Sequence, residues 1–227
     1  LIDNGYSISQ IQLSLPHLED QKEIEAEISG LLRQGKTSVG FGGPLTIAKA
    51  GLKSEFMLES KGELNFGDKP LPYQIKTQGT FASLEKSFDI HSKTLSWMGE
   101  SPLPNLQANL NLSIGDNLKI DSNGIISEWP KDWPTLPAPL NQQTKNIPYQ
   151  LNYVGKLDLS DAIALKLDID KSQFSSSVRI SDMQQWIEQA DGSPLPPLQG
   201  TFDMPLIQLD GVRLEGVSIE ITPDATQ

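Results

Sequence analysis

The sequence contains no cysteine and only two histidines among its 227 residues. The absence of cysteine excludes disulfide bonds, thiol nucleophiles and thiolate metal sites, and it leaves the cellular compartment open. His17 and His91 lie in unrelated sequence contexts, so we interpret both as ordinary surface or strand residues and not as a catalytic base or a metal-binding pair. A G-x-S-x-G nucleophile elbow and a zinc-binding H-E-x-x-H motif are also absent. These absences predict a protein that is not an enzyme and that holds no metal or cofactor.

Basic residues are scarce, with 18 Lys and Arg against 29 Asp and Glu and a formal net charge of −11. This balance argues against nucleic-acid partners, which require a basic surface, and it gives no long-range attraction to an anionic membrane. No run approaches 18 consecutive apolar residues, and no charged-then-apolar signal sequence opens the chain. The abrupt start LIDNGYSI and the end IEITPDATQ favour a soluble segment of a longer protein.

One segment of the sequence matches the consensus pattern of a phosphate-binding loop. Residues 30–38, GLLRQGKTS, fit the pattern G-x-x-x-x-G-K-[ST] through Gly30, Gly35, Lys36 and Thr37. The motif binds phosphate only where a strand leads into it and a helix begins at its Lys-Thr. Apolar residues at helical spacing, acidic residues in the first turns and Gly35 just past the end instead predict a helix over 18–34. Glycines and a proline at 40–44 oppose a helix after the motif, so we predict no nucleotide binding.

The dominant period elsewhere is two, as expected for strands with one apolar and one polar side. In LQANLNLSI, residues 106–114, apolar and polar residues alternate strictly, and FDMPL and VSIEI follow the same rule. Turn signals separate these short segments, which is typical of antiparallel sheets. The pattern predicts a mainly β fold with a minor helical part, arranged as an antiparallel, curved meander sheet.

The chain also repeats itself. Residues 101–114, SPLPNLQANLNLSI, align without gaps with residues 193–206, SPLPPLQGTFDMPL. Three shorter pairs keep the same order, namely 72–81 with 148–157, 88–90 with 165–167, and 116–120 with 210–214. Each copy reads as four strands, so we predict a four-stranded meander made twice.

These features divide the chain into four parts that we expect to form one continuous structure. They are an N-terminal segment with the helix and strands (1–71), a first β-repeat unit (72–127), a Pro-rich connector (128–147) and a second β-repeat unit (148–227). A short second helix is predicted in the second unit, with Ser181 as N-cap, Gly192 as C-cap, and Met183, Trp186, Ile187 and Ala190 on one face.

The repeated apolar strand face is the candidate functional surface. It has two interpretations, because the apolar side of a sheet is normally the sealed core of a sandwich, whereas a sheet that curls leaves a groove open to acyl chains. Periodicity does not separate the two. The candidate groove residues are Leu106, Leu110, Leu112, Ile114, Leu198, Phe202, Met204 and Leu206.

Two other clusters have ordinary interpretations beside functional ones. Trp129 and Trp133 in the Pro-rich connector either stack on a sugar or pin the connector to the sheet. The acidic residues Asp158, Asp161, Asp168 and Asp170 lack the glycine and the closing glutamate of a calcium loop, so we expect them on the solvated face.

Residues 177–221 resemble the repeating module of the AsmA-like, TamB-related superfamily of bacterial envelope proteins. That module runs through a strand, a short D-hxxWh helix, a pLPpLxG segment and a strand pair with a central glycine. The matching residues are Asp182, Trp186, Leu195, Pro196, Leu198, Gly200, Gly211, Leu214 and Val217. The internal repeat extends the resemblance to 72–127, while residues 1–71 match poorly.

The resemblance implies a non-enzymatic periplasmic segment of a protein anchored in the inner membrane outside this segment. Its curved sheet would offer an apolar groove to phospholipid or another envelope lipid, in lipid transport or outer-membrane assembly, with further envelope proteins as possible partners. The resemblance implies no cofactor and no catalytic residue, and we expect neither a nucleotide nor a nucleic acid as a partner. The alternative is an extracytoplasmic β-sheet module that binds glycans or partner proteins through the Pro/Trp connector.

Overall fold

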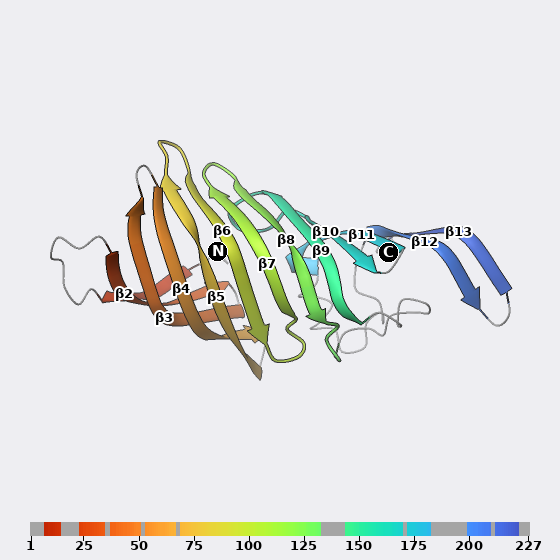
Figure 1. Ribbon diagram of the computed structural model, residues 1–227, viewed down its shortest axis with the longest axis horizontal. Coiled ribbons are helices and arrows are strands. Elements are labelled where there is room, and N and C mark those ends of the chain that lie inside the picture. Colours follow the sequence, from red (N-terminus) through yellow and green to blue (C-terminus); the bar gives the residue numbers. More distant parts are fainter. Residues whose placement is uncertain are drawn as a thin grey trace, which may run out of the picture.

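The computed structural model describes residues 7–14, 23–34, 37–50, 53–66, 69–132, 144–169, 172–182, 199–209 and 212–222. Thirteen strands form a single sheet, and their order along the chain is also their order in space (Figure 1). They are β1 (Ser7–Ser14), β2 (Glu23–Gln34), β3 (Thr37–Ala50), β4 (Lys53–Phe66), β5 (Lys69–Ser83), β6 (Phe88–Gly99), β7 (Asn105–Ile114), β8 (Leu118–Glu128), β9 (Lys145–Gly155), β10 (Ile163–Ile169), β11 (Ser172–Val178), β12 (Gln199–Leu209) and β13 (Val212–Ile221). Every neighbouring pair is antiparallel. The predicted mainly β, antiparallel meander is therefore confirmed.

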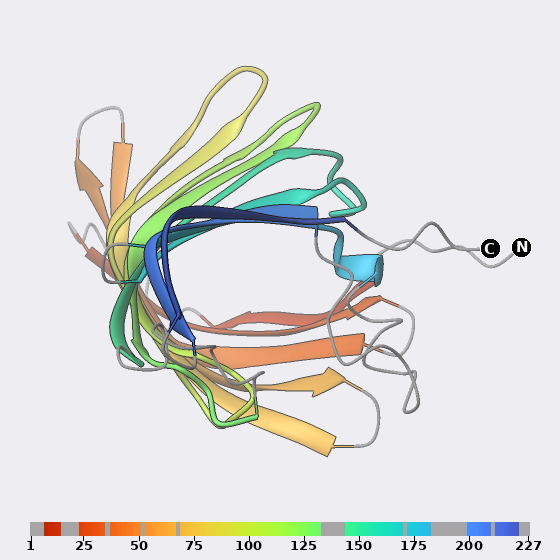
Figure 2. The same ribbon diagram turned by 90° about the vertical axis from the view of Figure 1, so that its right-hand side faces the viewer.

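The sheet curls into an open trough (Figure 2). Figure 1 faces the convex back of this trough, whereas Figure 2 looks along it with the opening on the right. Each strand bends around the trough axis, so that one side of every strand lies on the concave face and the other on the convex face. Curvature of this kind follows from the right-handed twist of strands when no second sheet flattens them.

The predicted helix over 18–34 is wrong, because residues 23–34 form strand β2. This strand pairs along its whole length with β3, from Glu23 opposite Ala48 to Gln34 opposite Thr37. Ile24 and Ile28, which suggested helical spacing, also fall on every second position of EIEAEISGLL, where glutamates alternate with them, whereas Leu31 lies on the other face. Period two accounts for all of these residues except Leu31, and pairing with a neighbouring strand decided between the two periods. The remaining predicted helical residues, 18–22, lie outside the described residues.

The two sequence repeats differ by one strand. Residues 72–127 fall on the four strands β5 to β8, whereas residues 148–227 hold five strands, β9 to β13. The additional strand is β11, which precedes the predicted second helix. Because each strand reverses the chain direction, this insertion makes β12 run opposite to β7, the strand with which its sequence aligns. Of the predicted second helix, only the turn at 180–182 lies within the described residues.

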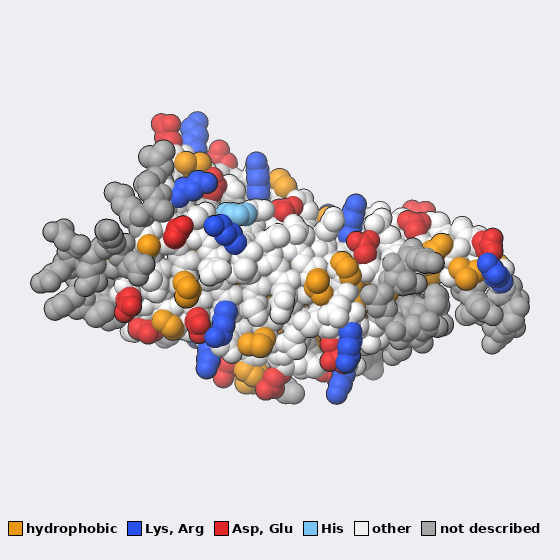
Figure 3. Space-filling model, in the orientation of Figure 1, with side chains coloured by type: hydrophobic (Ala, Val, Ile, Leu, Met, Phe, Trp, Pro, Cys, Tyr) orange, Lys and Arg blue, Asp and Glu red, His pale blue; other side chains and the backbone are white. Residues whose placement is uncertain are grey.

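The cross-strand registers assign charged and apolar side chains to opposite faces. Lys, Arg, Asp and Glu side chains spread over the convex back of the sheet (Figure 3). On the concave face of β2 to β12, the interior positions hold apolar residues, glycine, serine and threonine. Among the residues whose side chains the structure describes, charged residues occupy this face only at strand ends, at Glu128 and Lys145. The convex face is therefore solvated, whereas the interior positions of the concave face carry no charge.

Small residues form one row along the concave face. Gly79, Ser92, Ser122, Ser176 and Gly200 lie in this row, and Leu110, Leu151 and Leu165 occupy the positions between them. Register shifts interrupt the ladder at Gly79 and Ser92, and such bulges bend a strand. Side chains on a concave surface converge, so small residues in this row let the strands bend inward.

Replacement of Gly79 by alanine is expected to destabilise the fold by about 1–3 kcal/mol. An added Cβ would lie 2.0 Å from the carbonyl oxygen of His91 on the neighbouring strand, so the two strands would have to move apart. The matched control is Gly40→Ala, where the nearest atoms would lie 3.9 Å from the new Cβ. Chemical denaturation of both variants checks the prediction, and equal midpoints would contradict the close approach of β5 and β6.

Candidate functional site

The residues predicted to line a groove do lie on one face, but their surroundings differ. Those on β7 and β12 point to the concave face at alternate positions. Leu106 and Phe202 pack against a buried cluster, and Met204 is itself buried. Leu110 and Leu112 are half-buried, and Ile114 and Leu206 are exposed. The last predicted residue, Leu198, lies outside the described residues.

A sealed cluster occupies the concave face of β8 to β10. Its members are Ile126, Ile147, Tyr149, Leu167 and Ile169. Ile147 and Ile169 are the most completely buried of these, with exposed fractions of 0% and 1%. This part of the face is a protein core in the ordinary sense. This part of the apolar face is thus sealed from water within a single sheet, without a second sheet of the kind that a sandwich has in the described part of the chain.

The concave face is more open towards one edge of the sheet. Along β7, burial falls from Leu106, which contacts the cluster, through half-buried Leu110 and Leu112 to exposed Ile114. Phe88, the cross-strand partner of Ile114, is also exposed. Water therefore reaches apolar side chains on the inside of the trough at this edge. The alternation of apolar and polar residues in the sequence does not distinguish these positions. It therefore did not indicate the decrease in burial along β7.

The tyrosine hydroxyl groups of Tyr73, Tyr149 and Tyr153 on the concave face have partners within the protein. Burial raises the pKa of Tyr73, Tyr149 and Tyr153 above the ordinary value of 10.0, so these phenols remain neutral. Tyr73 donates to the Gly40 carbonyl at 3.0 Å, Tyr149 shares a hydrogen bond of 3.0 Å with Ser122, and Tyr153 donates to the Lys156 carbonyl at 2.7 Å. These tyrosines consequently present carbon, and not an available polar group, to the trough.

Two polar atoms of the concave face lack such partners. Among the described residues, the buried Nε1 of Trp97 and Oγ of Ser176 have no hydrogen-bond partner. The Trp97 ring stacks on Tyr73, with centroids 4.7 Å apart and an interplanar angle of 11°. Neither residue was singled out from the sequence, because an isolated Trp or Ser in an alternating strand carries no functional signal.

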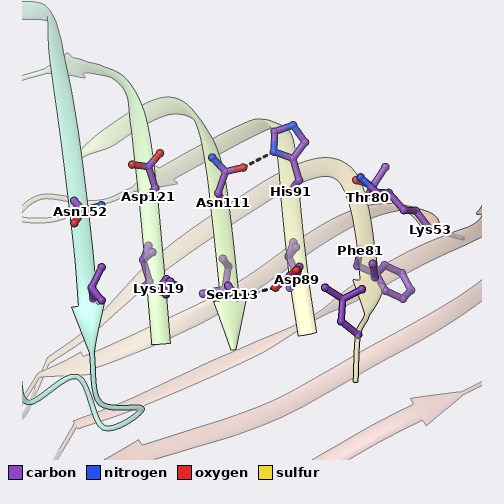
Figure 4. A pocket seen from close by; sticks show the side chains of 16 residues that line it. Lys53, Thr80, Phe81, Asp89, His91, Asn111, Ser113, Lys119, Asp121 and Asn152 are labelled. Carbon is purple, nitrogen blue, oxygen red and sulfur yellow. Dashed lines mark hydrogen bonds between the residues drawn. The ribbon is translucent and has the colours of Figure 1, made fainter. Parts of the chain in front are cut away.

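The convex face holds a shallow hollow of about 580 Å³ (Figure 4). A row of polar side chains crosses it, formed by Thr80, His91, Asn111, Asp121 and Asn152 on neighbouring strands. His91 Nδ1 hydrogen-bonds Asn111 Oδ1, and in the adjacent row Ser113 Oγ donates to Asp89 Oδ1 at 2.6 Å. Polar side chains on neighbouring strands thus pair with one another here, as on the solvated side of a sheet. His17 lies outside the described residues.

The segment that matches the phosphate-binding pattern, residues 30–38, lies at the end of β2 and the start of β3. Gly30 lies inside β2 opposite Phe41, whose Cζ would be 2.4 Å from a Cβ added to this glycine. Strand β3 begins at Thr37, where the motif would require a helix. Gly35 and Lys36 lie outside the described residues. The glycine thus makes room for an aromatic ring across the sheet, and the motif lacks the helix start that cradles phosphate.

The Trp129 ring packs against the sealed cluster. Its backbone N–H donates to the Thr144 carbonyl at 2.7 Å, which fixes the start of the Pro-rich connector beside β9. This packing favours the interpretation in which the tryptophan pins the connector to the sheet. Trp133 lies outside the described residues.

The acidic residues after β9 stabilise a turn. Asp158 accepts from the Ser160 N–H at 3.0 Å, and Asp161 accepts from the Lys156 N–H at 2.8 Å. Hydrogen bonds from Ser160 hold the pKa of the Asp158 carboxyl below its ordinary value. In the described part of the chain, no three His, Asp or Glu residues are grouped so that they could hold a metal ion. Asp168 accepts from Gln173 at 3.0 Å, and Asp170 lies outside the described residues.

Comparison with protein-family models, with curated proteins and with solved structures found no match. No helix within the described ranges is long and apolar enough to cross a membrane.

Proposed function

We propose that the concave face of the trough binds the acyl chains of a lipid and that the protein is not an enzyme. The observation that carries the proposal is the concave face, whose interior positions across β2 to β12 hold no charged residue and whose apolar side chains on β6 and β7 are half-buried or exposed. A sheet of this length with one apolar side must cover that side, and an acyl chain has the shape and chemistry to do so.

The energetics favour a long alkyl chain as the occupant. Each methylene removed from water contributes about 0.8 kcal/mol, so contact along a few strands offsets the cost of holding a flexible chain. Polar ligands gain little there, because the three buried tyrosine hydroxyls are already hydrogen-bonded and the two atoms without a partner, Trp97 Nε1 and Ser176 Oγ, are buried. Charged headgroups would remain outside the trough, since the interior offers them no counter-charge.

The resemblance to the AsmA-like superfamily extends this proposal to a cellular setting. We place the chain in the periplasm of a bacterial envelope, as part of a protein anchored in the inner membrane and active in lipid transport or outer-membrane assembly. The support is the D-hxxWh and pLPpLxG segments together with a curved, repeat-like sheet. Glycan binding through the connector has less support, because Trp129 is engaged with the sealed cluster.

The test is to purify the protein from a bacterial envelope without detergent and to analyse its organic extract by mass spectrometry. A soluble protein of equal mass is the control. Phospholipid at near-stoichiometric amounts is the expected result. A fluorescent fatty acid should also bind in a saturable way when it is titrated into the purified protein that has not been exposed to organic solvent. Clean protein that also fails to bind the fatty acid would contradict the proposed function.

A further inference from the structure

One edge of the trough carries five of the eleven exposed large apolar residues found in the described part of the chain. Three neighbouring turns meet there, at 84–87 between β5 and β6, at 115–117 between β7 and β8, and at 156–162 between β9 and β10. The exposed large apolar residues in or beside these turns are Leu84, Phe88, Ile114, Val154 and Leu157. We name this edge the apolar rim. Leu84 and Leu157 lie within the turns and have exposed fractions of 57% and 52%.

The opposite edge is built differently within the described residues. Leu103, in the turn between β6 and β7, packs on Gly99, where its Cβ would be 2.6 Å from an added Cβ. Trp129, at the end of β8, packs against the sealed cluster. Leu103 and Trp129 thus fold back onto the sheet at that edge, where Met98 is 45% exposed beside the turn, whereas Leu84 and Leu157 project from the turns of the apolar rim. Both sets belong to turns of one meander, so turn geometry alone does not explain the difference.

The apolar rim is continuous with the open part of the concave face. Phe88, Ile114 and Leu118 are cross-strand neighbours in the last row before the turns. Ile90, Leu112 and Ile120 form the next row inward. A hydrocarbon chain that entered over the rim would therefore meet apolar side chains without crossing a polar row.

We propose that the apolar rim docks on the surface of a lipid bilayer and is the place where acyl chains enter or leave the trough. This inference rests on the proposed function. Exposed apolar side chains at projecting turns are typical of sites that insert into a membrane interface. An acyl chain that passes directly from bilayer to trough avoids exposure of its methylenes to water, which is the main barrier to lipid extraction.

The charges of the three turns decide which kind of bilayer fits. They hold Lys86 and Lys156 against Glu85, Asp116, Asp158 and Asp161. This balance does not favour an anionic surface, and the chain as a whole carries a net charge of −11. The partner is therefore a zwitterionic lipid surface, bound by apolar insertion and with little dependence on salt.

The experiment compares two double variants of the whole chain. Leu84→Ser with Leu157→Ser removes the tips of the rim, and Met57→Ser with Ile125→Ser removes two comparably exposed residues from the convex face. Flotation with small phosphatidylcholine vesicles measures docking. Fluorescent fatty acid in the absence of vesicles measures binding by the trough, and thermal unfolding checks that each variant folds.

We expect the rim variant to lower the vesicle-bound fraction about ten-fold or more, since two half-exposed leucines lose their insertion. The convex-face control should change it less than about two-fold. Both variants should bind the fatty acid as the parent does. Equal losses in the two variants, or a parent that binds only vesicles rich in phosphatidylglycerol, would overturn the proposal.

A parent that binds the fatty acid but no vesicle would also overturn the rim proposal and point to a protein partner, while the proposed function would stand. A parent that binds no fatty acid in solution would instead remove the proposed function itself. The two failures are thus distinguishable.

Discussion

Aspartate in place of Leu110 is expected to lower the affinity for a fatty acid by about 100-fold or more while the protein keeps its fold. Leu110 faces the inside of the trough between Ser92 and Ser122, in the row of small residues. It is half-buried and lies outside the sealed cluster. Water therefore solvates the new carboxylate in the free protein, whereas a bound acyl chain would have to desolvate it.

The matched control for this variant is Asn109→Asp. It adds the same charge on the same strand, but on the convex face, and should leave fatty-acid affinity unchanged. Titration with a fluorescent fatty acid measures both variants, and circular dichroism verifies the fold. Unfolding of Leu110→Asp would show that the face is sealed core at this position as well. Normal binding by a folded Leu110→Asp protein would place the acyl chain elsewhere.

Phe202→Asp tests the same face at a less suitable position. Phe202 pairs with Phe174, with ring centroids 5.9 Å apart, and both pack against the sealed cluster. A charge there should weaken folding as well as binding. Loss of lipid in this variant alone would thus be weak support for a binding face.

Alanine in place of Ile147 is expected to reduce the free energy of unfolding by about 2–5 kcal/mol. Its side chain is fully buried, with an exposed fraction of 0%, in the sealed cluster on β9. The truncation leaves a cavity between β8 and β10 that the surrounding strands cannot easily fill.

The control is Ile125→Ala on β8, where the isoleucine is 43% exposed on the convex face. It should cost less than about 1 kcal/mol, because most of its surface is already in water. Urea denaturation of both variants gives the comparison. Similar losses would mean that the concave face of β8 to β10 is not the main core of the sheet.

Alternation alone was enough to predict the β fold and the strands around 106–114. It failed at 18–34 because EIEAEISGLL satisfies two periods at once, and only the twelve-residue pairing of β2 with β3 resolves them. Strand β11 was missed because SQFSSSV is rich in serine and has few apolar residues to mark one face.

The sequence predicted which residues share the apolar face, but it did not predict how deeply each of them is buried. Leu106 and Ile114 occupy equivalent positions in the sequence pattern, yet one contacts the sealed cluster and the other is exposed. Both lie on β7, and they differ because Leu106 lies beside the sealed cluster whereas Ile114 is the last residue before the turn. Exposure at Leu84 and Leu157 was missed for a related reason, since a leucine in a turn gives no hint of whether it folds back or projects.

The strictly sequential strand order also bears on how the chain reaches its fold. Among the described strands, each pairs only with the strands before and after it, so no strand pairing has to bring distant parts of the chain together. Loop-closure entropy is then small at every step, and such local topologies fold faster than sheets of the same size with long-range pairing. Stability approximates a sum over adjacent hairpins, as in repeat arrays. Unfolding that begins at either end of the sheet can therefore stop at an intermediate strand. Addition or loss of a hairpin during evolution likewise changes the length of the trough without disturbing the remaining strand pairs.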